Sequence, residues 1–401
     1  MTSPFDVRVL GPLAPLRDGF CEELQRLGYS PLSIANQVRV MAHLSRWMVD
    51  EQANVGELTP QRASAFLQAR REVGYTCWLS ERGLAPLLGF LGAEGLLPGQ
   101  VTPVAEGPLE ELLVVYRIFL VEERALAATT VARYGVTARW FLSLCGWSAS
   151  EVAAVTAEQV YSFVLAECPP RSVGLAKNIV CELRSLLRFL FVTGRVPSDL
   201  SPVVPAVAGW RGSALPKALD ATVVAQLLAS CDRGTATGRR DRAVLVLLSR
   251  VGLRAGEVAG LTLDDLDWSA GEMVIRGKGS REERLPLPVD VGETIVGYLR
   301  DGRPRSAERA LFLGVRAPHR AMTNGAVSAV VGEACRRAGV PPVGSHRLRH
   351  TVATELLSAG AGLSEVGQLL RHRSADTTVI YANVNVNALR RLAQPWPQVS
   401  L

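Results

Sequence analysis

Residues Ser345 to Tyr381 hold the densest collection of reactive side chains in the chain. This segment contains Tyr381, Arg349 and three of the five histidines. These histidines are His346, His350 and His372. His346 and Arg349 are three residues apart in a helical pattern, so they project from the same side of one helix. Clustered cationic side chains beside a phenol predict a site for an anionic group.

The use of basic residues singles out one more position. Of the 44 basic residues, 41 are arginines and only three are lysines: Lys177, Lys217 and Lys278. Arginine stays protonated at any working pH, whereas a lysine can release a proton when its pKa is lowered. Lys278 lies in a Gly-Lys-Gly turn between two predicted strands. It is therefore either a solvated hairpin tip or a proton donor.

The composition indicates a folded protein with two or three domains. Hydrophobic residues make up 48% of the 401 residues, and the net charge of +6 mildly favours a polyanionic partner. The apolar runs are too short to cross a bilayer, and the N-terminus lacks the pattern of a signal peptide. The seven cysteines are scattered and never in C-x-x-C spacing, which favours reduced thiols in the cytoplasm over a zinc site. No Walker-type phosphate loop or metal-ligand cluster is evident, so we expect no cofactor and no metal.

The elements that must position these side chains are mostly helices. The first half of the chain is predicted to contain two related four-helix units, because similar residues recur at a nearly constant offset. Leu44 and Phe66 match Phe141 and Phe163 at an offset of 97, and Leu87–Leu91 matches Leu186–Leu190 at an offset of 99. The alternative is that two unrelated helical bundles align loosely.

Segments rich in proline and glycine divide the chain into three predicted domains. These are residues 1–105, residues 106–205 and residues 216–401. The second domain carries arginines on predicted helical faces, and these are candidates for contacts to phosphate groups or simply solvated charges. They are Arg133, Arg139, Arg171 and Arg184.

The third domain is predicted to contain helices and one β-hairpin, which makes the whole chain mainly α with a small antiparallel sheet, an α+β catalytic domain. Arg254 is placed at the start of a short helix that contains Glu257. The predicted strands are Met273–Arg276 and Arg284–Leu287, and the predicted helices are 220–228, 241–250, 291–299, 324–338 and the one that carries His346.

Four motifs in this domain give the chain a strong resemblance to the tyrosine recombinase (phage integrase) family. The motifs are GLRAGEVAGL around Arg254, GKGSREERLPL around Lys278, HRLRHTVAT, and LLRHRSADTTVIY ending at Tyr381, within residues 215–397. The resemblance implies that Tyr381 is the nucleophile and that Arg254 and Arg349 clamp the phosphate. It also implies that Lys278 is the general acid, supported by His346 and His372. Glu257 and His350 would then lie behind these groups, with Glu257 orienting an arginine or histidine.

The residue types suit that chemistry. Attack on a phosphodiester builds extra negative charge, which two guanidinium groups can bind through paired hydrogen bonds. A tyrosine with an ordinary pKa of about 10 needs a positive environment or a base, and the leaving 5′-oxygen needs a proton that Lys278 can supply. Taken singly, the same residues could be surface arginines, a capping pair or one face of an amphipathic helix.

Two departures from the family pattern stand out. Arg371 replaces the usual small residue before the second histidine, and with Arg373 it is expected either to contact DNA phosphate or to face solvent. Glu282 and Glu283 lie where the hairpin is often basic, which argues against direct DNA contact there.

The resemblance implies a site-specific recombinase that cuts and rejoins duplex DNA through a 3′-phosphotyrosine, most similar to recombinases of mobile elements. The helical core-binding domain would be duplicated at the N-terminus. Double-stranded DNA and further copies of the chain are the expected partners, as a dimer on a site and a tetramer in synapsis, with other recombinases as further candidates and no membrane. The expected location is the cytoplasm, on the nucleoid. The alternatives are a catalytically silent DNA-binding member of the same fold and a type IB topoisomerase.

Overall fold

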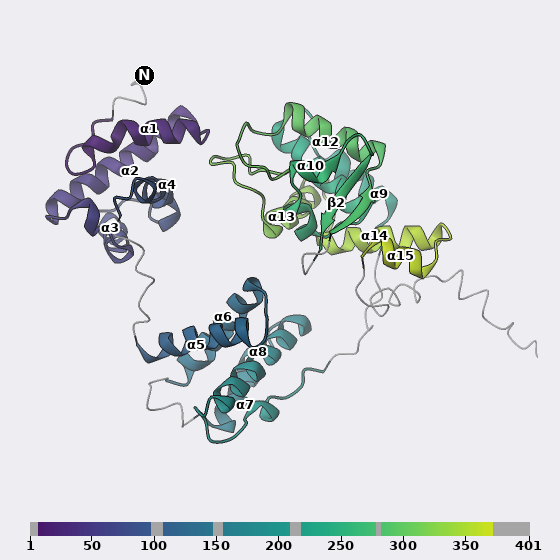
Figure 1. The fold of residues 1–401 in the computed structure, drawn as a ribbon, viewed down its shortest axis with the longest axis horizontal. Coiled ribbons are helices and arrows are strands. Elements are labelled where there is room, and N and C mark those ends of the chain that lie inside the picture. The colour runs from purple at the N-terminus through teal and green to yellow at the C-terminus, as the bar shows by residue number, and fades with distance from the viewer. Residues whose placement is uncertain (1–6, 98–106, 147–154, 209–217, 278–281, 372–401) are drawn as a thin grey trace, which may run out of the picture. The chain divides into compact units, whose positions relative to one another are not determined.

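The computed structural model describes residues 7–97, 107–146, 155–208, 218–277 and 282–371. The chain divides into two compact units, residues 99–213 and the remainder. Within the described residues there are three large, separate hydrophobic cores, one in residues 7–97, one in 107–208 and one in 218–371. Figure 1 shows these three parts of the chain.

Residues 7–97 form a helical unit. Its helices are α1 (Arg17–Arg26), α2 (Pro31–Asp50), α3 (Pro60–Glu72) and α4 (Glu81–Ala93), with short 3₁₀ turns η1 (Ala14–Leu16) and η2 (Val55–Glu57). Ser30 and Thr59 cap α2 and α3 and are each followed by proline at the first helical position.

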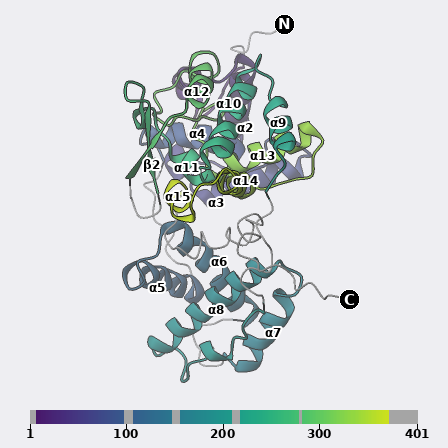
Figure 2. The ribbon, with the colours of Figure 1, turned by 90° about the vertical axis from the view of Figure 1, so that its right-hand side faces the viewer.

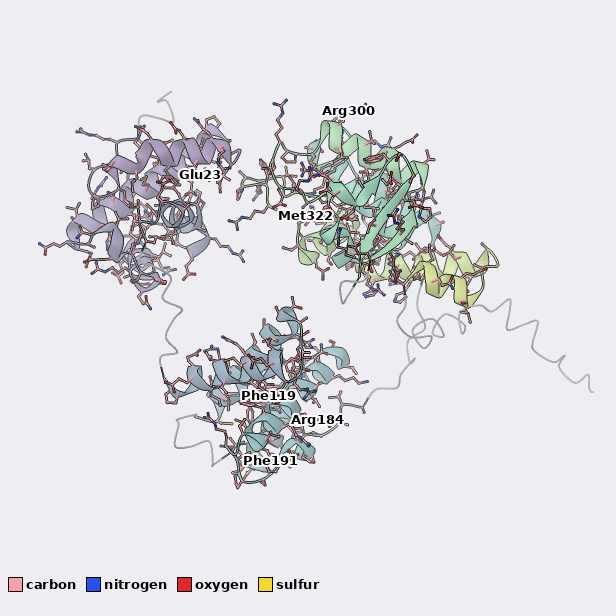
Figure 3. The ribbon with its side chains drawn as sticks, viewed as in Figure 1. Glu23, Phe119, Arg184, Phe191, Arg300 and Met322 are labelled. Carbon is pink, nitrogen blue, oxygen red and sulfur yellow. The ribbon has the colours of Figure 1, made fainter. Side chains whose placement is uncertain are left out.

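Residues 107–208 form a second helical unit. It consists of α5 (Pro108–Glu122), α6 (Ala128–Leu144), α7 (Ala157–Glu167), α8 (Val173–Val192) and the 3₁₀ turn η4 (Ser201–Val203). Figure 3 shows Phe119 of α5 beside the core of this unit, where its ring lies 5.2 Å from that of Phe189.

The two helical units share a pattern of burial as well as a pattern of sequence. α2 begins at Pro31 and α6 at Ala128, 97 residues later, and α3 and α7 begin at Pro60 and Ala157, again 97 residues apart. Equivalent positions are buried in both units. Examples are Ile34 and Val131, Leu44 and Phe141, Leu58 and Val155, Phe66 and Phe163, Leu87 and Leu186, and Phe90 and Phe189.

The remaining part, residues 218–371, combines helices with a small sheet, so the predicted fold class is confirmed. Strands β1 (Leu266–Asp267), β2 (Glu272–Arg276) and β3 (Glu282–Pro286) are antiparallel in the order β1-β2-β3. The helices are α9 (Ala221–Ala229), α10 (Ala236–Val246), α11 (Ala255–Gly260), α12 (Val289–Asp301), α13 (Asn324–Ala338), α14 (Ser345–Ser358) and α15 (Leu363–Leu369). The turns η5 (Leu247–Val251, π-helical) and η6 (Leu263–Asp265, 3₁₀) complete this part.

Strand β1 was not predicted from the sequence, because a two-residue strand is too short to show an alternating pattern of apolar and polar residues. Met273 and Ile275 of β2 and Leu285 of β3 turn into the core, while their neighbours in the strands are more exposed. Figure 2 shows α15 beside α14. These two helices, together with α11 and the π-helical turn η5, carry the candidate active site. Among the described residues, no helix has the length and apolar character needed to cross a membrane.

Candidate active site

The site begins where α11 begins. Arg254 is the N-cap residue of α11, and Glu257, one turn into the helix, accepts a hydrogen bond from the Arg254 backbone N–H at 2.7 Å. The other Glu257 oxygen accepts from Nη1 of the Arg254 side chain at 2.6 Å. The same carboxylate therefore caps the helix and orients the guanidinium. The Arg254 side chain remains 37% exposed.

A π-helical turn sets the chain path immediately before Arg254. The turn is followed by its C-cap residue Gly252, which has a left-handed φ of 68°. A Cβ atom at this position would lie 2.8 Å from Cδ2 of Leu370, so only glycine fits without displacing that side chain. Nη1 of Arg349 donates to the Gly252 carbonyl oxygen at 2.6 Å. The glycine thus allows the backbone to approach closely and offers an acceptor to a catalytic candidate.

Helix α14 brings Arg349 into the same place. Arg349 is buried, with 2% of the side chain exposed, and its Nη2 donates to the Leu370 carbonyl oxygen. Its Nη1 lies 3.8 Å from Oε2 of Glu257. A guanidinium carries five N–H groups in one plane, so two bonds to carbonyl oxygens fix its orientation firmly.

The histidines of α14 lie one turn apart. The rings of His346 and His350 are stacked, with centroids 5.8 Å apart. Burial lowers the pKa of His346 below its ordinary value, and the positive charges of Arg349 and Arg254 lower it further. Burial also lowers the pKa of His350. His346 is therefore neutral near pH 7 and able to accept a proton.

Arg371 does not face solvent, which was one of the two roles expected for it. It is 9% exposed, and its Nη2 donates to Oε2 of Glu257 at 2.7 Å. Its Nη1 donates to the Leu369 carbonyl oxygen at 2.9 Å, and its own carbonyl oxygen accepts from Nη2 of Arg254 at 3.2 Å. The side chain points into the protein because Glu257 offers a buried negative charge there.

Glu257 is the common partner in this group. It is 7% exposed and faces Arg254, Arg349 and Arg371. Burial alone would raise the pKa of Glu257, but hydrogen bonds from Arg371 and from the Arg254 backbone outweigh it and hold the pKa below its ordinary value. The carboxylate is therefore ionised at neutral pH and leaves the cluster with a net positive charge, which suits an anionic substrate.

The base of the predicted hairpin is also held by ion pairs. Arg276, at the end of β2, pairs with the buried Asp265 at 2.5 Å and with Glu282 of β3 at 3.1 Å. Arg276 and Glu282 are directly opposite in the antiparallel register. Glu282 thus neutralises a neighbouring arginine within the hairpin. Lys278 lies in the sequence between these two strands and outside the described residues.

Four predicted residues cannot be placed in this geometry. Lys278, His372, Arg373 and Tyr381 lie outside the described residues. The structure brings together Arg254, Glu257, His346 and Arg349, with His350 and Arg371 beside them. Among the described residues, Arg254 and Arg371 are almost 120 positions apart in the sequence and both contact the carboxylate of Glu257.

The arginines expected to contact phosphate in residues 107–208 all have partners within the protein. Three pair with carboxylates and one with a carbonyl oxygen, so part of their hydrogen-bonding capacity is already used. The pairs are Arg133 with Glu182, Arg139 with Glu110, Arg171 with Glu167, and Arg184 with the Val204 carbonyl oxygen. Figure 3 labels Arg184 in this unit. The phosphate contacts of these residues stay a prediction.

Sequence reasoning missed the backbone acceptors at Gly252, Leu370 and Arg371, because a carbonyl oxygen has no signature in a sequence. It also missed the direction of the Arg371 side chain. Arg371 occupies a position where a small residue is usual, but its partner Glu257 lies 114 residues away in the sequence, so no sequence signal gave the direction of the side chain.

Comparison with known proteins places this geometry in a family. Residues 217–388 match the Phage integrase family. The chain is 37% identical over 396 residues to "Putative integrase/recombinase y4rA" of Sinorhizobium fredii, and the match covers 96% of this chain and 95% of that one. It is 30% identical over 283 residues to "Tyrosine recombinase XerD" of Listeria monocytogenes, covering 69% of this chain and 95% of the relative.

A solved structure agrees at the level of the fold. The XerH site-specific recombinase, described as bound to palindromic difH substrate in a post-cleavage complex, matches with a TM-score of 0.57 and 17% identity, over 82% of this chain and 93% of that one. The chain belongs to the phage integrase family of tyrosine recombinases. It is a site-specific recombinase enzyme.

Proposed function

We propose that the chain cleaves and rejoins duplex DNA with Tyr381 as its nucleophile and with Arg254 and Arg349 as its phosphate clamp. One observation carries the assignment of the clamp. The two guanidiniums, from the start of α11 and from α14, face one buried carboxylate and are fixed by backbone carbonyl oxygens. Such preorganised donors lower a barrier because they need not reorient when charge develops on the phosphate.

The proposed reaction needs one proton to move on each side of the phosphorus. The Tyr381 oxygen bonds to phosphorus, its proton passes to His346 or to solvent, and the bond to the 5′-oxygen breaks. Lys278 gives that oxygen its proton, with His372 as a further hydrogen-bond donor to the phosphate. The neutral state of His346 supports its part as the acceptor. The phosphotyrosine bond keeps the energy of the broken bond, so attack by a new 5′-hydroxyl rejoins the strand without a cofactor.

Double-stranded DNA is the proposed partner, with two copies of the chain on each site and four in synapsis. Other recombinases are further candidate partners. The XerH recombinase is bound to a palindromic difH substrate in a post-cleavage complex, which supports a substrate that is cut at a specific site. The relative named integrase/recombinase matches almost the whole chain, including the first helical unit. We infer a mobile-element role, in which the enzyme integrates, excises or transposes DNA on the nucleoid in the cytoplasm.

The proposed division of labour gives residues 216–401 the chemistry and residues 106–205 the binding of the core site. Residues 1–105 would be a duplicate of that binding unit that acts as an arm. Buried residues recur at the same offset of 97 residues in α2 and α6 and in α3 and α7, which supports duplication. An alternation of apolar and polar residues is common to all amphipathic helices and does not by itself produce a constant offset between two units.

The test is trapping of a covalent protein–DNA adduct. Nicked duplexes tiled across the DNA that flanks the gene would let the cleaved fragment diffuse away and leave the chain attached to a 3′-phosphate. Adduct with the natural chain and none with Tyr381→Phe supports the proposal. Binding without adduct would indicate a catalytically silent member of the fold. Relaxation of any supercoiled plasmid by a monomer would indicate a topoisomerase.

A further inference from the structure

Arg371 adopts a backbone conformation that its side chain makes unfavourable. Its φ is 53°, in the left-handed region where glycine is the usual residue and other L-residues are strained. The side chain is also a charged group with only 4% of its area exposed. A residue that strains the backbone and buries a charge persists where surrounding contacts compensate.

The contacts of Arg371 lead to the candidate clamp. Its Nη2 hydrogen bonds to Oε2 of Glu257, the oxygen that also accepts from the Arg254 backbone N–H and lies nearest to Arg349. Nη1 of Arg371 is held by the Leu369 carbonyl oxygen. Within the part of the chain that the structure describes, Nε of Arg371 has no hydrogen-bond partner.

These contacts affect how much positive charge the clamp keeps. Glu257 carries one negative charge and faces three arginines. Arg371 donates a hydrogen bond to Oε2 of Glu257 and partly neutralises this carboxylate. Nη1 of Arg349 lies farther from the same oxygen, at 3.8 Å. The N–H groups of Arg349 therefore stay on the backbone carbonyl oxygens, and more of its charge is left for an anionic substrate.

The turn that contains Arg371 also holds the clamp directly. The Leu370 carbonyl oxygen accepts from Arg349, and the Arg371 carbonyl oxygen accepts from Arg254. The side chain of Arg371 joins this turn to Glu257, so the turn and α11 cannot move apart without breaking a buried ion pair. The two guanidiniums are thereby fixed from both sides.

We propose that Arg371 is a positioning residue for the strand-cleavage reaction, which holds the 369–371 turn against Glu257 and so fixes Arg254 and Arg349 for the scissile phosphate. The proposal rests on the proposed roles of Arg254 and Arg349. Direct contact of Arg371 with DNA is the alternative role, and a separate measurement of the Kd distinguishes it from positioning.

The experiment is a double-mutant cycle in the full-length chain on the nicked duplex that gives the adduct. Single-turnover adduct formation at saturating DNA, and the Kd for that DNA, are measured for Arg371→Gly, Glu257→Gln and the double variant. Arg371→Gly relieves the left-handed strain, which offsets part of the cost of removing the buried partner of Glu257. It is expected to slow cleavage at least about tenfold while the Kd changes by less than about twofold.

Because Arg371 acts through Glu257, the double variant should cleave no more slowly than the slower single variant. Arg371→Lys, which keeps the charge but not the planar fork, should recover part of the rate. Arg300→Ala is the matched control, since Arg300 is an exposed arginine of α12 paired with Asp301, and it should cleave at the natural rate.

Three results would overturn the proposal. Rate losses that multiply in the double variant would show that Arg371 acts independently of Glu257. A weakened Kd with an unchanged cleavage rate would make Arg371 a DNA contact. A natural rate in Arg371→Gly would show that it does not position the clamp. If Arg371→Gly does not fold, Arg371→Met takes its place in the cycle. Failure of the natural chain to form adduct would instead count against the proposed function.

Discussion

Replacement of Glu257 by glutamine should disturb the candidate active site, because three hydrogen bonds end on this carboxylate. The substitution keeps the size of the side chain and removes its negative charge. Glu257 accepts from the Arg254 backbone, from the Arg254 side chain and from Arg371, all within 2.7 Å. An amide has only one oxygen, so it cannot accept all three bonds with the same geometry.

The magnitude follows from those contacts. If the amide oxygen takes the place of Oε2, the amide nitrogen faces Nη1 of Arg254, and one charge-assisted hydrogen bond worth about 1.5–3 kcal/mol is lost. Arg371 also keeps a buried charge without a negative partner. Removal of one member of a buried ion pair costs about 3–5 kcal/mol, so we expect a loss of about 3 kcal/mol for this conservative change. If Arg254 is also misaligned, cleavage should fall about 100- to 1000-fold, the effect of one lost transition-state donor.

Hydrogen exchange of the α11 and α14 amides in the full chain measures the loss of stability. Single-turnover adduct formation measures the fall in cleavage rate. Glu333→Gln is the matched control, because Glu333 pairs with Arg336 on the surface of α13 with both side chains more than half exposed. Exposed pairs contribute about 0–1 kcal/mol, so this control should behave like the natural chain. Equal protection and equal cleavage rates in Glu257→Gln and Glu333→Gln would contradict this expectation.

Three further predictions concern the acid, the base and the arm. Lys278→Arg should cut cleavage of ordinary DNA severely and recover on a 5′-bridging phosphorothiolate, whose leaving group needs no proton; equal loss on both substrates would mean that Lys278 is not the acid. Folding lowers the pKa of the His346 ring, so the unfolded chain takes up a proton at a higher pH than the folded chain does. The stability contributed by the neutral ring is therefore complete above about pH 6.5 and is lost as the pH falls through the pKa of the folded state. The melting temperature should therefore fall more between about pH 7 and pH 5 in the natural chain than in His346→Gln, and equal falls would contradict this. Deletion of residues 1–105 should spare adduct formation on a single site and weaken assembly of several copies, and loss of single-site cleavage would place the arm in the catalytic clamp.

Helices were the most predictable part of the fold. Ser30 and Thr59, each followed by proline, mark the starts of α2 and α3, and the predicted helix 324–338 has the bounds of α13. The helix predicted from Asp241 instead begins at Ala236, where Thr235 caps it, and continues into a π-helical turn. A π-helical turn is a rare single turn with i→i+5 hydrogen bonds inside a helix, and the 3.6-residue periodicity of the sequence does not mark its position.

The site was predictable to the extent that its chemistry lies in side chains. Arg254, His346 and Arg349 stand in motifs whose residue types and spacing carry the prediction, and the structure brings them together. What holds them could not be predicted in the same way. Gly252 and Leu370 act through carbonyl oxygens. Arg371 turns inward because of a carboxylate 114 residues away in sequence.

In the proposed reaction Tyr381 attacks DNA phosphate. The most direct measurement is the mass of the peptide left on DNA after trapping with a nicked duplex and digestion. We expect a 3′-phosphate joined to the peptide that contains Tyr381, and no adduct from Tyr381→Phe. A covalent adduct of equal yield from Tyr381→Phe, or attachment at any other residue, would contradict it.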